Sequence, residues 1–262
     1  MVTNTSSTVS QTAVVHLPEW LTLGIRYLGL ASGLLAIVFV INNFLIFGFD
    51  LPGPLGILTG ESNSQLGWGQ VAILLVAMVY PAWRLKNGGS LRTDAKSLEP
   101  IADYIIRIAF WAVFFVGLAD ALISFLRVED LHKVLFGPDI ATLLGMSNQR
   151  GTYVHIPLML VAAYVASRDK SVSIVWLALL VVIAELFIVL ARFVFAYEQT
   201  FMGDLVRFWY AALFLFASAY TLKEDAHVRV DVFYANFTRR TRSILNVTGT
   251  VAFGLPLCWL IL

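Results

Sequence analysis

The sequence predicts an all-α, polytopic membrane protein with about seven transmembrane helices and a cytoplasmic N-terminus. Hydrophobic residues make up 59% of the 262 residues and charged residues only 13%, whereas soluble domains carry about 25% charge. Seven apolar runs reach or approach the length of about 17 to 25 residues that a helix needs to cross a bilayer. The formal net charge is +1, and no basic tract is present. The expected surroundings are therefore membrane lipid, and nucleic acid is not expected as a partner.

The predicted spans follow one another from residue 20 to the last residue. They cover 20–49, 66–83, 104–126, a short run at 153–167, 172–196, 205–222 and 243–262. Residues 50–65 contain two prolines and three glycines, which predicts a loop. Residues 85–100 predict a polar link that ends at Pro100, just ahead of the third helix. Apolar residues within 128–150 predict a short interfacial helix.

The orientation follows from the positive-inside rule. Lys and Arg gather in the links after the second, fourth and sixth predicted spans, whereas the loops after the first and fifth carry acids. The odd-numbered spans are therefore expected to run outward. Residues 1–19 contain no Lys or Arg and so lack the positive region of a signal peptide. They are expected to be a disordered tail, with the first span retained.

One polar segment, YTLKEDAHVRVDVFY at 220–234, stands between the last two predicted spans. Its charges cannot lie in hydrocarbon, so it must surface at one face of the bilayer. His227, Arg229 and Asp231 alternate with valines, so in extended backbone the polar groups project to one side. These charges either stay solvated beside the membrane or make a specific contact.

From about residue 176 onward the chain resembles the small membrane subunit, of DctQ type, of TRAP transporters, which depend on a periplasmic binding protein. The resemblance rests on LARFVF at 190–195, Asp204 ahead of an aromatic helix, and HVRVD at 227–231. The family more often has Glu where Asp204 stands. The resemblance implies three parts: a tail at 1–19, a four-span extension at 20–170, and a small-subunit region at 171–262. The family's region ends with one more helix, so this region is expected to lack its last helix.

The resemblance also implies a function without a catalytic residue. A small subunit of this family braces the scaffold of the large permease subunit (DctM type) in the bacterial inner membrane. The large subunit carries the solute in a sodium-coupled, elevator-like movement, and a periplasmic solute-binding protein delivers it, usually an organic acid. The expected subunit-interface or structural residues are Arg192, Asp204, His227, Arg229 and Asp231.

Two acids, Asp120 and Glu185, lie inside predicted spans. A charge at the centre of a membrane helix costs about 2.5 to 3.5 kcal/mol on insertion scales. The functional interpretation is an ion or proton path, and the structural one is a partner on a neighbouring helix or subunit, or protonation. Each acid precedes an Arg by seven residues, which is about two turns of one helix face and suggests a duplicated two-helix unit. Arg192 is expected to pair with Glu198 or Asp204.

Other classes of membrane protein fit less well. A self-sufficient secondary carrier using Asp120 and Glu185 remains the alternative, although paired Gly/Pro-broken helices in matching halves are missing. A rhodopsin-like protein would need a Lys in the last span, and a haem protein would need paired His, whereas only His155 lies in a span. Cys258 is the only cysteine, and no hydrolase motif is present. Neither an enzyme nor a cofactor or metal site is expected.

Overall fold

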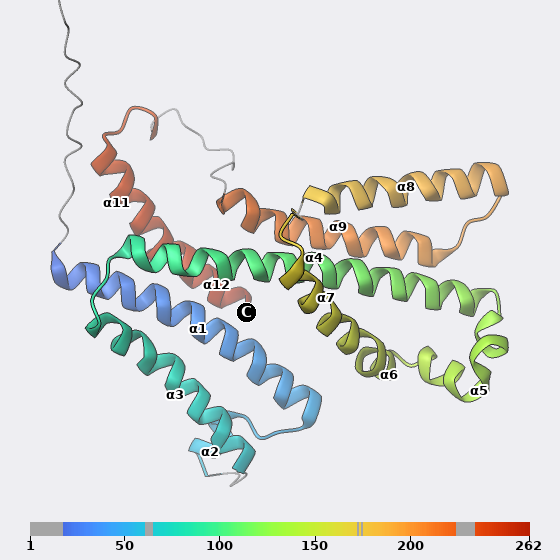
Figure 1. The fold of residues 1–262 in the computed structure, drawn as a ribbon, viewed down its shortest axis with the longest axis horizontal. Helices are drawn as coiled ribbons and strands as arrows, with labels where there is room; N and C mark the ends of the chain where they lie inside the picture. Colours follow the sequence, from blue (N-terminus) through green and yellow to red (C-terminus); the bar gives the residue numbers. More distant parts are fainter. Residues whose placement is uncertain (1–17, 61–64, 172, 174, 224–233) are drawn as a thin grey trace, which may run out of the picture. The chain divides into compact units, whose positions relative to one another are not determined.

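The computed structural model describes residues 18–60, 65–171, 173, 175–223 and 234–262 (Figure 1). Over these residues the chain is helical and contains no strand. Among the described residues, six helices are long and apolar enough to cross a membrane. They are α1 (Glu19–Phe49), α3 (Gln65–Lys86), α4 (Leu91–Val128), α8 (Val175–Phe195), α9 (Thr200–Lys223) and the run Arg239–Ile261. The predicted all-α, polytopic membrane class is confirmed.

The short fourth predicted span, 153–167, lies within a continuous helical run. Here α6 (Ser147–Arg150) leads through the π-helical turn η1 (Gly151–His155) into α7 (Ile156–Arg168). This run is not among the six helices that are long and apolar enough to cross a membrane. A total of seven spans therefore stays a prediction, as does the cytoplasmic N-terminus.

One predicted boundary is wrong, because α4 begins at Leu91 and Pro100 lies inside it rather than ahead of it. The helix starts where the Ser90 hydroxyl accepts a hydrogen bond from the backbone N–H of Thr93, at 3.3 Å, directly after the left-handed Gly88 and Gly89. This capping hydroxyl supplies a start signal of its own, and a proline inside the helix removes only one backbone donor.

Both connections, the predicted loop at 50–65 and the stretch 128–150 with its predicted short helix, contain short helices. The loop at 50–65 contains α2 (Pro54–Leu58), which has Pro54 at its first position. The interfacial helix predicted within 128–150 is α5 (Leu131–Gly145). It bends at Gly137, whose φ of 79° no ordinary helical residue adopts, immediately before Pro138.

The described chain divides into two compact units. The first contains α1, α2, α3 and the first turn of α4, together with α11 (Arg239–Gly249), η2 (Thr250–Gly254) and α12 (Leu255–Ile261). Helices α1 and α3 lie side by side in opposite directions (Figure 1), and the Tyr27 hydroxyl donates to the Met78 carbonyl across them at 3.2 Å. The ring of Trp259 on α12 meets Phe39 of α1 edge-on, at 6.3 Å between centroids.

The second unit contains the rest of α4 and the helices from α5 to α9. Its core is formed by α4, α8 and α9, and α8 and α9 make an antiparallel hairpin (Figure 1). Helix α8 buries Leu177, Ala184 and Ala191, which are spaced by seven residues and so share one face. The core residues are Phe110, Val113, Leu177, Ala184, Val206, Trp209 and Ala212.

Helices α4 and α9 approach each other closely in this unit. Trp209 Nε1 donates to the Val113 carbonyl at 3.2 Å. A methyl group added at Gly117 would lie 2.4 Å from the same Nε1, so only glycine lets the indole reach the backbone of α4. This contact fixes the helix that carries Asp120 against the hairpin.

Candidate functional site

Asp120 finds partners from its own chain. Its Oδ1 lies 3.0 Å from His155 Nε2, at hydrogen-bonding distance, and 3.5 Å from Arg150 Nε, in an ion pair. Helix α4 supplies the acid, while α6 and η1 supply the two bases. The Asp120 side chain is 39% exposed. The structural interpretation of this acid, a partner on a neighbouring helix, therefore has direct support.

Glu185 is placed differently. It lies at the middle of α8 and is exposed. In the part of the chain that the structure describes, it makes neither a hydrogen bond nor an ion pair. Its surroundings on the helix surface are apolar, with Val182, Leu186 and Val189 also exposed. The described residues thus supply no partner for this carboxylate.

The charges near the α8–α9 connection pair with one another. Of the two predicted partners of Arg192, the structure selects Glu198, with Nε 3.3 Å from Oε2. Asp204 pairs instead with Arg207, one turn further along α9, at 3.3 Å. All four side chains are more than half exposed, so each pair contributes little to stability. Whether Arg192 and Asp204 contact another subunit stays a prediction.

A further acid is tied to this connection from the end of α4. The Tyr197 hydroxyl donates to Glu129 Oε1 at 2.6 Å. The carboxylate stabilises the protonated phenol and raises the pKa of Tyr197 to about 12. This hydrogen bond links two connections that are distant in the sequence.

The remaining predicted interface residues, His227, Arg229 and Asp231, lie outside the described residues. Their role as a contact stays a prediction.

Sequence reasoning missed the most buried ion pair described here. Arg26 Nε on α1 lies 2.6 Å from Asp94 Oδ2 in the first turn of α4, and both side chains are buried. The same guanidinium donates to the Gly88 carbonyl at 3.0 Å, and Arg84 Nε lies 3.9 Å from Asp94. An Arg inside an otherwise apolar first span was the available signal. This cluster connects α1 to the link between α3 and α4, and it has the character of a structural anchor.

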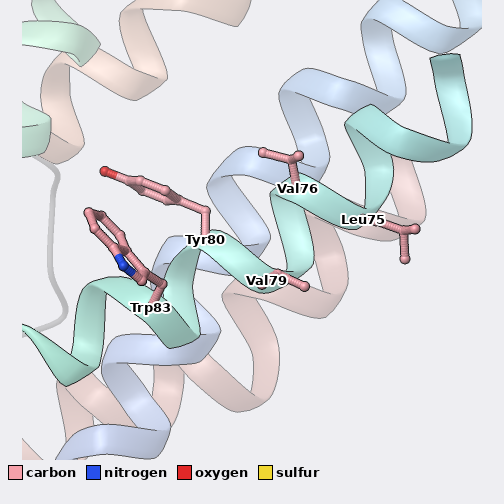
Figure 2. Close-up of a pocket in the computed structure, with 5 residues that line it drawn as sticks. All are labelled: Leu75, Val76, Val79, Tyr80 and Trp83. Atoms are coloured by element: carbon pink, nitrogen blue, oxygen red, sulfur yellow. The ribbon is translucent and has the colours of Figure 1, made fainter.

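An open apolar hollow of about 410 Å³ lies on α3 (Figure 2). The rings of Tyr80 and Trp83 lie together over one part of it, 5.8 Å apart between centroids. The lining residues are Leu75, Val76, Val79, Tyr80 and Trp83, all exposed and none charged. Such a surface suits contact with lipid tails better than binding of a charged solute. Over the described residues, no group of three or more His, Cys, Asp or Glu side chains is placed to hold a metal ion.

Comparison with known proteins identifies the C-terminal part of the chain. Residues 178–262 match the family model described as tripartite ATP-independent periplasmic transporters, DctQ component. No curated protein and no solved structure matches the chain. The matched stretch begins inside α8 and continues through α9 to the last helix, about a third of the sequence. The chain therefore has a region at 178–262 that matches the DctQ family model, preceded by an N-terminal extension of several apolar helices.

Proposed function

We propose that the chain is the small integral-membrane subunit of a TRAP transporter in the bacterial inner membrane. The observation that carries this proposal is the match of residues 178–262 to the DctQ component of this transporter class. The six apolar helices that could cross a membrane agree with it.

In this function the chain braces another membrane protein and carries out no reaction itself. The large permease subunit carries the solute, coupled to sodium, and the periplasmic solute-binding protein delivers an organic acid or a similar small solute. The packing of α4, α8 and α9 supports a rigid part, because their shared core holds the α8–α9 hairpin against a third helix. The outer faces of these helices are exposed and apolar, so they can contact lipid or a partner.

The proposed division of labour follows the sequence. Residues 171–262 form the subunit region that binds the large permease subunit. Residues 20–170 form an extension that widens the scaffold, and residues 1–19 precede it. Within the subunit region, Arg229 and Asp231 are the proposed contact at the membrane surface, with His227 between the same two spans.

Co-purification from native membranes tests the association. The tagged chain, extracted in mild detergent, should bring down a polytopic protein larger than itself, identified by mass spectrometry. Replacing Arg229 and Asp231 together by Ala should weaken this capture, whereas Arg240→Ala, a nearby charge on α11, should leave it unchanged. A chain that captures no polytopic protein would contradict the proposal.

Reconstitution tests the transport role. Liposomes that contain this chain, its co-purified partner and the binding protein should take up solute when a sodium gradient is imposed, and omission of this chain should abolish uptake. Sodium-driven uptake by this chain alone would instead establish the self-sufficient carrier.

A further inference from the structure

Glu185 lies too far from both ends of α8 for its carboxylate to reach water or lipid head groups at the membrane surface. It stands ten residues from either end of α8, which at the rise of an α-helix is about 15 Å. A Glu side chain is far too short to span that distance to the polar interface. Whatever stabilises this carboxylate must come to it inside the hydrocarbon region.

Several basic side chains of the same unit are engaged with other acids. Arg192, two turns along α8, pairs with Glu198, and Arg207 pairs with Asp204. The bases Arg150 and His155 belong to Asp120. The described part of this unit therefore leaves no cation at Glu185.

The helix surface around Glu185 has the form of a helix-packing face. Val182 and Val189, three residues before and four residues after it, are its neighbours on the surface, and both are exposed. We call Val182, Glu185 and Val189 the Glu185 stripe. The face that α8 uses within its own unit, formed by Leu177, Ala184 and Ala191, lies on another side. Within its own unit, the Glu185 stripe is thus left exposed and can receive one further helix.

Charge decides which helix can occupy the stripe. Two copies of this chain insert in the same direction, so a twofold pairing through the stripe would place one Glu185 against the other. Two like charges in hydrocarbon repel strongly, which disfavours a second copy. A helix of a different protein that carries a Lys, Arg or His at the same depth would instead satisfy the carboxylate.

We propose that the Glu185 stripe is the docking site for a membrane helix of a different subunit, which presents a basic side chain to Glu185 within the bilayer. This assignment rests on the proposed function, in which that subunit is the large permease. It locates the contact inside the membrane, separately from the Arg229 and Asp231 contact at the surface. The ion pair would fix the depth and rotation of the partner helix against α8.

Photo-crosslinking in native membranes tests the site directly. A photoreactive amino acid at position 189 should crosslink to a polytopic partner, whereas the same group at position 187, an exposed Phe on another side of α8, should not. The crosslinked partner peptide should contain a Lys, Arg or His inside an apolar run. A peptide without a basic residue, crosslinks to a second copy of this chain, or equal crosslinking from both positions would overturn the proposal.

Substitution of the acid gives a second, independent readout. Glu185→Gln should reduce co-purification of the partner by about tenfold or more, equivalent to the loss of one strong contact. Glu185→Asp should retain most of it, and Glu129→Gln, which removes an exposed acid outside the stripe, should change nothing. Wild-type capture of a polytopic partner that Glu185→Gln leaves intact would refute the stripe and keep the proposed function. No capture by the wild type would refute the proposed function itself.

Discussion

Asp120 and Glu185 differ in the structure although the sequence presents them in the same way. Each lies in an apolar helix seven residues before an Arg. Asp120 is reached by His155 at 3.0 Å and Arg150 at 3.5 Å, while Glu185 is exposed to an apolar surface with no partner from the described chain. One acid is part of the internal structure of this protein. The other has no partner among the described residues, and the proposed docking helix would supply one.

The difference teaches how to interpret a charge in a membrane helix. The cost of a charge in hydrocarbon applies to both acids, so each needs a partner or a proton. An acid with a partner in its own chain contributes to the fold. An acid without one is a candidate for contact with another subunit. Neither arrangement by itself requires an ion or proton path through the chain.

The largest loss of stability is expected at the buried pair of Arg26 and Asp94, in which both charges find their partner inside the chain. Replacing Arg26 by Met leaves the Asp94 carboxylate buried with Arg84 at 3.9 Å and deprives the Gly88 carbonyl of its donor. Removing one partner of a buried pair costs about 3 kcal/mol or more. Unfolding of the purified chain by SDS in mixed micelles measures this loss.

The matched variants for Arg26 separate charge from shape. Arg26→Lys keeps the charge but loses the planar fork, so its stability should lie between those of wild type and Arg26→Met. Wild-type stability in Arg26→Met would show that this cluster does not anchor α1 to the start of α4.

The next effect concerns the contact that holds α4 in place. Gly117→Val would put side-chain atoms where Trp209 Nε1 now lies, 2.4 Å from the position of the first added carbon. Overpacking of this kind costs about 1 to 3 kcal/mol, and the hydrogen bond to the Val113 carbonyl would be lost as well. The tryptophan emission spectrum and the SDS unfolding midpoint should both change.

Gly203→Ala is the control for the Gly117 substitution, because α9 has open space at that position. Its unfolding midpoint should be unchanged or slightly raised, since alanine favours the helix over glycine. Equal losses in Gly117→Val and Gly203→Ala would mean that the Trp209 contact has no special role.

Replacing the two acids should change the stability of the isolated chain less, and in opposite directions. In the isolated chain, Asp120→Leu should destabilise by about 1 kcal/mol, because it abandons His155 and Arg150, and the pair is partly exposed. Glu185→Leu should cost nothing and can stabilise, because it removes an unsatisfied carboxylate. SDS unfolding of both variants measures the contrast directly.

A double-mutant cycle sharpens the same contrast. The double variant Asp120→Leu with His155→Leu should lose less free energy of unfolding than the sum of the two single variants, since the two side chains contact each other. Additive losses would argue against the contact. Destabilisation of the isolated chain by Glu185→Leu would argue that Glu185 has an internal partner after all.

The fold could be predicted from the sequence largely because membrane insertion is a local property. The predicted spans 20–49, 66–83, 172–196, 205–222 and 243–262 agree with helices of the structure to within a few residues, since each depends only on its own apolar run. The start of α4 is harder to predict, because Pro100 is the more conspicuous start signal and Ser90 marks the start only through its hydroxyl contact. The fourth span stays a prediction because the helical run that contains it is not among the candidate membrane spans.

The candidate site was predicted less completely, for a physical reason. Residues 150 and 155 reach Asp120 from 30 and 35 positions away, through a connection that bends at Gly137. No periodicity in the sequence reports such a contact. The pairing of Arg192 with Glu198 was accessible because the two lie close together in the chain. The difference between Asp120 and Glu185 depends on tertiary packing, and the spacing of each acid from its Arg is identical.

The smallest effect is expected at the exposed hydrogen bond between Tyr197 and Glu129. Because the pKa of Tyr197 is raised to about 12, above the ordinary value of about 10, the bond contributes fully below pH 10. Its contribution is lost as the pH rises through about 12. Difference titration of tyrosinate absorbance between wild type and Tyr197→Phe should show one group ionising near pH 12. In Glu129→Gln that group should return toward its ordinary range, because the carboxylate that raises the pKa is gone. A difference titration near pH 10 in the wild type, with the fold intact by circular dichroism, would show that the two connections are not joined through this bond.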